Sequence, residues 1–137
     1  MEINISDISK LYFSTHGRLN RKPYLIRRLK LFIGPVVLLS IIANVSKINI
    51  LYEIFETLFL ILIMLLFVST FMLSVRRLHD LNHSGWFTVF MVIPILSLII
   101  NVYMLFFSGT NGANDYGNDP LEEHRQEREQ KVTNGIG

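Results

Sequence analysis

Hydrophobic residues in this chain gather into three long blocks, with polar residues between and around them. The blocks cover residues 31–47, 56–75 and 86–107, and their interiors contain no charged side chain. The second and third blocks are long enough to cross a bilayer as α-helices, whereas the first needs its flanking bases to reach the headgroups. The pattern predicts an all-α, polytopic membrane protein with three transmembrane helices.

The third block, residues 86–107, contains Pro94 near its middle, and proline interrupts the hydrogen bonds of a helix. A kinked helix that crosses the membrane is one interpretation. The alternative is a re-entrant hairpin, in which two short arms enter and leave on the same side. A full crossing places the tail of the chain opposite the turn before the block, and a hairpin returns the tail to the side of that turn.

The two ends of the chain are polar or only partly apolar. Residues 3–13 place apolar groups three to four positions apart, which predicts an interfacial helix at the N-terminus, although a frayed end fits equally. Residues 109–120 are dense in turn-forming residues, and we expect a hydrogen-bonded turn over the outer end of the spans. We assign residues 1–120 to one membrane domain and residues 121–137 to a charged, flexible tail.

The distribution of basic residues predicts the orientation, because bases near span ends stay in the cytoplasm. Only Lys47 lies in the loop between the first two blocks, while Arg76 and Arg77 follow the second. The arm before the first block is rich in bases: Lys10, Arg18, Arg21, Lys22, Arg27, Arg28 and Lys30. The N-terminus and the turn around residues 76–85 are therefore expected in the cytoplasm, and three crossings would put the C-terminus outside it.

One polar cluster follows the second block. If its helix continues past the membrane surface, Arg76, His79, Asp80 and His83 lie on one face. Such a cluster would bind a phosphate or a lipid headgroup together with the basic arm. A metal would need a third strong ligand, which the spacing of the histidines does not supply, and the chain has no cysteine. We predict no metal site and no cofactor.

A structural interpretation of the same residues stays open. In it, Asp80 pairs with Arg76, or with Arg18 or Arg21, and Ser84 caps the third block. Arg76 and Arg77 then anchor the end of the span. The candidate contacts for a lipid headgroup are Arg18, Arg21, Lys22, Arg76, Arg77, His79 and Asp80.

Three polar segments carry a resemblance to a known family: Gly17–Tyr24, Arg76–Trp86 and Gly109–Pro120. In this order, separated by apolar blocks, the chain resembles the bacterial "domain of unknown function 805" family of YhaH-like inner-membrane proteins, over roughly residues 10–120. The resemblance implies a small multi-pass protein of the bacterial inner membrane, without an established activity. Two positions depart from the family pattern: Pro23 stands where Glu is usual, and Asp115 stands where Arg is common.

The expected role is therefore non-enzymatic. We expect a scaffolding or accessory subunit that contacts anionic lipids and binds a membrane partner or further copies of itself. A lipid-handling enzyme that uses Arg76, His79 and Asp80 is the alternative, and an oligomeric channel lined by Ser69, Thr70 and Asn101 is another. Nucleic-acid binding is not expected, because the bases flank a span at headgroup depth, where lipid competes.

Overall fold

The computed structural model describes residues 5–44 and 50–135, and every regular element within these ranges is helical. The all-α prediction is thereby confirmed. The elements are α1 (Ile5–Tyr12), α2 (Arg21–Asn44), α3 (Ile50–Asp80), the 3₁₀ helix η1 (Gly85–Val92), α4 (Pro94–Phe106) and α5 (Pro120–Thr133).

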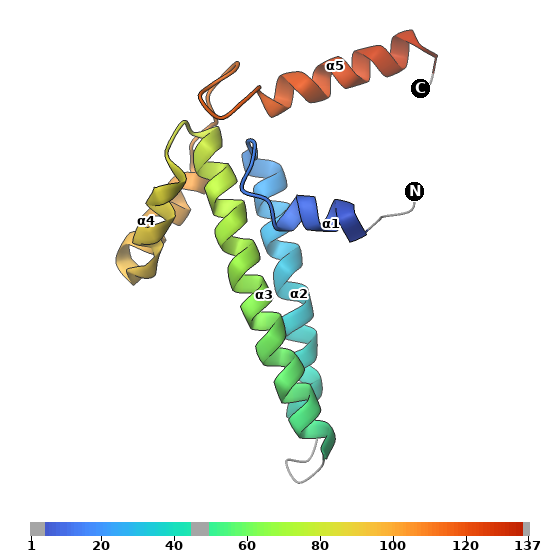
Figure 1. The fold of residues 1–137 in the computed structure, drawn as a ribbon, viewed down its shortest axis with the longest axis vertical. Helices are drawn as coiled ribbons and strands as arrows, with labels where there is room; N and C mark the ends of the chain where they lie inside the picture. The colour runs from blue at the N-terminus through green and yellow to red at the C-terminus, as the bar shows by residue number, and fades with distance from the viewer. Residues whose placement is uncertain (1–4, 45–49, 136–137) are drawn as a thin grey trace.

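Helices α2 and α3 form a long antiparallel hairpin that makes up the stem of the molecule (Figure 1). Asn20 immediately precedes α2, and its side-chain oxygen accepts a hydrogen bond from the backbone N–H of Arg21 at 2.6 Å. Pro23 lies in the first turn, where no intrahelical donor is lost. The stem therefore begins at the basic arm and returns to it.

Helix α3 contains the predicted span 56–75 and extends beyond it at both ends. Within the described ranges it is the one helix long and apolar enough to meet a membrane-span criterion. Its 31 residues are about 46 Å long, against about 30 Å for the hydrocarbon core of a bilayer. The predicted span 31–47 begins in α2, and its residues 45–47 lie outside the described ranges. Three spans are thus not confirmed.

The third block is not one helix. Helix η1 ends at Val92, Ile93 adopts an extended conformation, and α4 starts at Pro94. The two pieces fold back on each other beside the upper part of the stem (Figure 1). The backbone N–H of Thr110 donates to the carbonyl of Asp80 at 2.9 Å, so both ends of the block meet. The break expected near Pro94 thus lies at Ile93, and a full crossing of the membrane by residues 86–107 is not confirmed.

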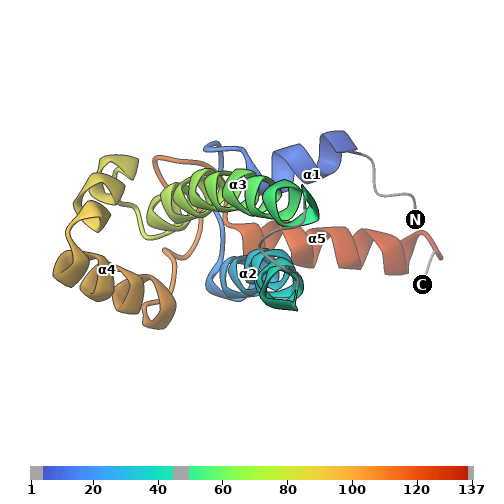
Figure 2. The same cartoon turned by 90° about the horizontal axis from the view of Figure 1, so that it is seen from below.

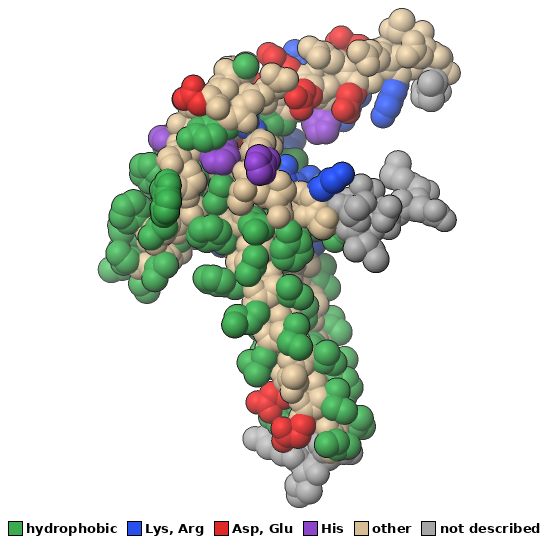
Figure 3. Space-filling model, viewed as in Figure 1, with side chains coloured by type: hydrophobic (Ala, Val, Ile, Leu, Met, Phe, Trp, Pro, Cys, Tyr) green, Lys and Arg blue, Asp and Glu red, His purple; other side chains and the backbone are tan. Residues whose placement is uncertain are grey.

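The buried core is small and lies at one end of the stem, where α2, α3 and α4 meet. Its buried hydrophobic residues are Leu19, Tyr24, Leu73, Leu78, Leu81 and Met104. Along the rest of α3, large apolar side chains face outward, among them Met64, which is 70% exposed, and Phe67, which is 67% exposed. On the face that Figure 3 shows, hydrophobic side chains are spread along the stem down to the acidic residues near its lower end. This surface is suited to lipid rather than to water.

Helices α1 and α5 lie on the opposite side of the stem from α4 (Figure 2). The C-terminal end of α1 packs on α3, because Ser69 Oγ donates to the carbonyl of Tyr12 at 3.0 Å. The helical expectation for the N-terminal segment is confirmed over Ile5–Tyr12. Helix α5 is capped by Asp119 and buries none of its residues, so the tail is a solvated helix over this range.

Candidate functional site

The three polar segments that carry the family resemblance meet at the core end of the stem. The loop before α2, the end of α3 and the loop after α4 lie together at the top of the molecule (Figure 1). The backbone N–H of Leu19 donates to the carbonyl of Arg76 at 3.1 Å, which joins the first segment to the second. The side-chain amide of Asn114 donates to the carbonyl of His79 at 2.9 Å, which joins the second to the third.

Asp80 lies at the centre of this junction, between two arginines. Arg18 Nε donates to Asp80 Oδ1 at 3.1 Å, and Arg77 Nη1 donates to Asp80 Oδ2. The side chains of Arg18, Arg77 and Asp80 are 1%, 0% and 3% exposed, respectively. Buried charges are tolerated only when they are paired and hydrogen-bonded, so these three side chains form a single unit, the Arg18–Asp80–Arg77 cluster.

Arg77 also closes the end of α4. Its Nε donates to the carbonyl of Met104 at 2.8 Å, and its Nη2 donates to the carbonyl of Phe107. The last carbonyls of a helix have no partner within the helix and carry partial negative charge. A guanidinium at that position satisfies them, which fixes α4 against α3.

Arg18 holds the loop after α4 in a similar way. Its Nη2 donates to the carbonyl of Thr110 at 2.5 Å, and its Nη1 donates to the carbonyl of Gly112 at 2.6 Å. Gly112 has a φ of +73° and Gly117 a φ of +129°, both in a region that favours glycine. The glycine-rich composition of this loop is therefore explained by its path around a single guanidinium.

The loop also closes on itself. Asp119 Oδ2 accepts from the backbone N–H of Gly112 at 3.1 Å, and its Oδ1 accepts from the N–H of Leu121 at 2.9 Å. A hydrogen-bonded turn was expected here and is confirmed. Its expected place over the outer end of the spans is wrong, because the loop binds Arg18 and Asp80 at the end that carries the arginines.

The predicted single face of Arg76, His79, Asp80 and His83 does not exist as such. Helix α3 ends at Asp80, and Asn82 adopts a left-handed conformation with φ +58°, so the helical spacing does not continue to His83. The His79 ring stacks on Tyr116 with centroids 4.0 Å apart. His83 Nε2 instead lies 2.9 Å from the hydroxyl of Tyr103, on α4.

The pairing of Asp80 was predicted in part. Arg18 was one of three expected partners and is confirmed, while the expected pairs of Asp80 with Arg76 and with Arg21 are wrong. Arg76 Nη1 donates to the carbonyl of Leu11 at 3.3 Å, at the end of α1. The second partner, Arg77, was missed, since it was expected only to anchor the span end. The predicted cap of Ser84 on the third block is confirmed by its bond from Trp86 N.

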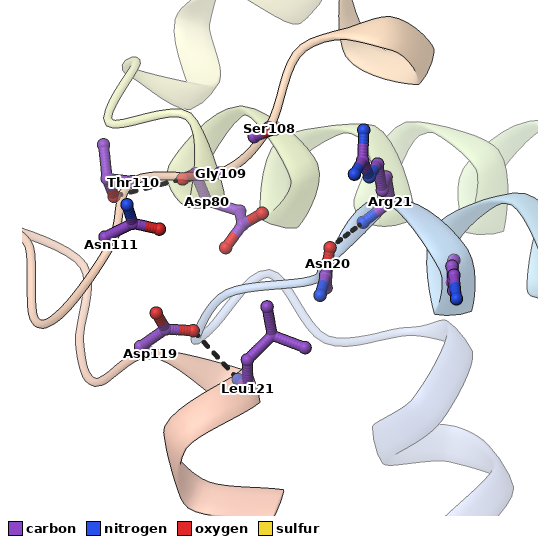
Figure 4. Close-up of a pocket in the computed structure, with 10 residues that line it drawn as sticks. Asn20, Arg21, Asp80, Ser108, Gly109, Thr110, Asn111, Asp119 and Leu121 are labelled. Carbon is purple, nitrogen blue, oxygen red and sulfur yellow. Dashed lines mark hydrogen bonds between the residues drawn. The ribbon is translucent and has the colours of Figure 1, made fainter.

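Arg21 and Lys22 remain exposed at the start of α2. They line a small polar pocket of about 320 Å³ with Asn20, Asp80 and Ser108 among its other walls (Figure 4). No hydrogen bond links these two bases to the Arg18–Asp80–Arg77 cluster. In the part of the chain that the structure describes, no three histidine or acidic side chains are close enough to bind a metal ion.

Sequence reasoning missed a second polar link, between α2 and α4. Arg28 Nη1 donates to Asn101 Oδ1 and to the hydroxyl of Tyr24. Asn101 also donates to the carbonyl of Ser97 at 2.7 Å. The signal was an amide in an apolar helix together with a base four residues after a tyrosine, but spacing alone does not reveal that the two helices touch.

Comparison with known proteins supports the family resemblance that the three polar segments carry. The chain matches a family model described as "Protein of unknown function (DUF805)" over residues 12–118. It is 26% identical over 114 residues to Inner membrane protein YhaI of Escherichia coli K12, an alignment that covers 82% of this chain and 91% of that protein. It is 34% identical over 59 residues to Inner membrane protein YhaH of the same strain, covering 43% of this chain and 49% of that protein.

No solved structure matches the chain. The family match covers the first two polar segments, most of the third, and the helices that bring them together. The chain belongs to the DUF805 family, whose named relatives YhaI and YhaH are inner membrane proteins.

Proposed function

We propose that this protein is a non-enzymatic inner-membrane protein that acts by binding anionic lipids and a membrane partner. The observation that carries the proposal is the internal use of the motif charges. Arg18, Arg77 and Asp80 bond to one another and to backbone carbonyls, and none is more than 6% exposed. A catalytic acid or a substrate-binding base presents a free polar atom to a cleft. Asp80 does border the small polar pocket, but both of its carboxylate oxygens are bonded to arginines.

The lipid-binding part of the proposal rests on the bases that the cluster leaves free. Arg21, Lys22 and Lys30 are exposed on α2, in the turns nearest the polar junction. Bases at this depth attract anionic headgroups by about 1 kcal/mol each. Two of the residues expected to contact lipid headgroups, Arg21 and Lys22, belong to this surface, whereas Arg18, Arg77 and Asp80 support the fold.

The partner-binding part rests on α5. A helix that is polar on all sides and buries none of its residues is suited to binding outside its own chain. The helix extends away from the stem as an arm (Figure 1). We propose a second copy of this chain or another inner-membrane protein as the partner. Neither alternative activity is favoured, because Asp80 is enclosed and Ser69 and Asn101 form internal hydrogen bonds.

Native mass spectrometry from mild detergent tests the proposal. We expect the wild-type chain to carry phosphatidylglycerol and to appear as an oligomer or a complex. The variant Arg21→Gln/Lys22→Gln/Lys30→Gln should lose most of the retained anionic lipid, since three attractive charges are removed.

The matched control is Arg125→Gln/Arg128→Gln/Lys131→Gln, which removes the same charge from α5 and should keep the lipid. A strictly monomeric chain that retains neither phospholipid nor protein would contradict the proposal.

We further propose that both termini face the cytoplasm. The predicted cytoplasmic N-terminus follows from the basic arm. Since residues 80 and 110 are hydrogen-bonded, a hairpin over residues 86–107 returns the tail to the side of the arm. The re-entrant alternative is therefore preferred here to three full crossings. Both pieces of the hairpin are short, with α4 about 20 Å long.

Single cysteines test this topology cleanly, because the chain has none of its own. In cells with a permeabilised outer membrane, an impermeant maleimide should label Glu53→Cys, near the far end of the stem. Lys22→Cys and Glu129→Cys should react only after the inner membrane is opened. Labelling of Glu129→Cys in intact inner membranes would instead support three crossings and exclude the hairpin.

A further inference from the structure

A second cleft, separate from the basic surface, lies between the loop after α1, helix α3 and helix η1. Its volume is about 710 Å³, within the range of small-molecule sites. Residues of four segments line it, including His16, His79, Trp86 and Tyr116. Neither the Arg18–Asp80–Arg77 cluster nor the exposed bases of α2 contribute a wall.

The walls of this cleft change from polar to apolar along α3. His79 stands at the polar junction, Val75 lies one turn below it, and Phe71 one turn below that. Val89 adds apolar surface from η1, and His16 adds a polar group from the loop. In the space-filling view, histidine side chains lie directly above the apolar face of the stem (Figure 3). The same gradient runs along a lipid, from headgroup to acyl chain.

The ring of His79 is fixed in place but incompletely bonded. It stacks parallel to Tyr116, with an interplanar angle of 6°. Its Nδ1 is buried beside the backbone of Gly17, whereas its Nε2, next to Gly85 on the wall of the cleft, has no hydrogen bond with the described residues. A ligand that offers a hydrogen-bonding group to Nε2 therefore gains affinity here.

Gly85 allows η1 to lie close against this wall. A methyl group at its position would come within 2.8 Å of Val75 Cγ1 and 3.3 Å of His79 Nε2. Next to it, Trp86 is 80% exposed, and tryptophan favours the headgroup level of a bilayer. The side of the cleft formed by η1 therefore faces lipid.

From this geometry we infer that the cleft binds one phospholipid molecule, with its glycerol-phosphate region at His16 and His79 and one acyl chain along Phe71, Val75 and Val89. The volume holds the headgroup and the upper part of a chain, and the remainder lies on the exposed apolar stem. Hydrogen bonds rather than ion pairs hold the headgroup, because no Lys, Arg, Asp or Glu lines the cleft. The inference does not depend on the proposed basic surface.

Trp86 is the only tryptophan of the chain, so its fluorescence reports on this cleft directly. The full chain in mild detergent is titrated with a phosphatidylglycerol whose acyl chains carry bromine, which quenches tryptophan on contact. We expect quenching that saturates at about one lipid per chain. His79→Phe keeps the stacked ring but removes its nitrogens, and should raise the half-saturating concentration about three- to tenfold.

A second variant, Val89→Phe, fills the apolar half of the cleft and should weaken binding even if His79→Phe does not fold. Phe106→Ala is the control. It removes an aromatic side chain of α4 that lies outside the cleft and is about as exposed as Trp86, and it should leave the quenching unchanged. The triple glutamine variant of α2 should also leave the quenching unchanged, which separates this site from the basic surface. An excess of sn-glycerol 3-phosphate should not reverse the quenching.

Quenching that rises with added lipid without saturating would overturn the inference. So would equal binding by wild type and every folded cleft variant. Reversal by glycerol 3-phosphate alone would show a site for a soluble phosphate and would equally exclude a phospholipid.

Discussion

Replacing Asp80 with asparagine is expected to remove most of the protein from the membrane fraction. The carboxylate is the only acidic partner of Arg18 and Arg77 among the described residues, and both side chains are at most 1% exposed. Removing one member of a buried ion pair costs about 3–5 kcal/mol, because the other charge stays buried without compensation. Two guanidinium groups lose their counter-charge here, and whole domains are stable by only about 5–15 kcal/mol.

The measurements are abundance in isolated membranes and the unfolding temperature in detergent. Asp115→Asn is the matched control, since it makes the same chemical change at an exposed side chain of the loop that contacts Asp80. It should leave both quantities near the wild-type values. The pair of variants separates the loss of a carboxylate in general from the loss of this one.

The result also distinguishes a structural cluster from an active site. An enzyme that used Asp80 would lose its phenotype in Asp80→Asn while accumulating normally. Normal abundance and an unchanged unfolding temperature for Asp80→Asn would therefore contradict the structural role and restore the alternative of a headgroup-level enzyme. The internal bonds of Arg18 to the loop after α4, and of Arg77 to the last turn of α4, lead us to expect the opposite.

Local patterns predicted the elements whose causes are local. The apolar run of 56–75 is found within α3, and Ser84 caps the helix that follows it. The choice of Asp80's partners is not local. Arg76 and Arg77 are both close to Asp80 along the helix, but Arg77 bonds to Asp80 and to the end of α4, whereas Arg76 bonds to the end of α1. The end of α4 lies 30 residues further along the chain than Arg77, beyond what side-chain spacing reveals.

The path of the third block could not be predicted from the sequence for a related reason. A crossing helix and a re-entrant hairpin have the same apolar composition, and Pro94 is compatible with both. The contact of residue 110 with Asp80 and the binding of Arg77 to the end of α4 bring the two ends of the block together, and these contacts are why we propose the hairpin. Arg77 was read as an anchor for the span that contains it, whereas it also closes the helix that follows. A base beside a span can anchor that span or bind the end of another helix, and the sequence alone does not distinguish these two roles.

Gly109→Ala is expected to destabilise the protein nearly as much as the loss of Asp80's charge. A methyl group at this position would lie 2.2 Å from Asp80 Oδ2 and 2.6 Å from its Cγ. A free carboxylate would rotate away at little cost. This one is held on both oxygens, by Arg18 and Arg77, so the added carbon must displace either the loop or the cluster. Overpacking alone costs about 1–3 kcal/mol, and separating the ion pairs adds to it.

Gly34→Ala provides the matched control for Gly109→Ala. Its methyl group would meet only Leu62 Cδ2 at 3.4 Å, an ordinary contact, and alanine favours a helix interior over glycine by about 1 kcal/mol. We therefore expect an unchanged or higher unfolding temperature for Gly34→Ala and a clearly lower one for Gly109→Ala. Equal behaviour of the two variants would show that the loop does not press against Asp80. The glycine of the third polar segment would then need an explanation other than its contact with the carboxylate.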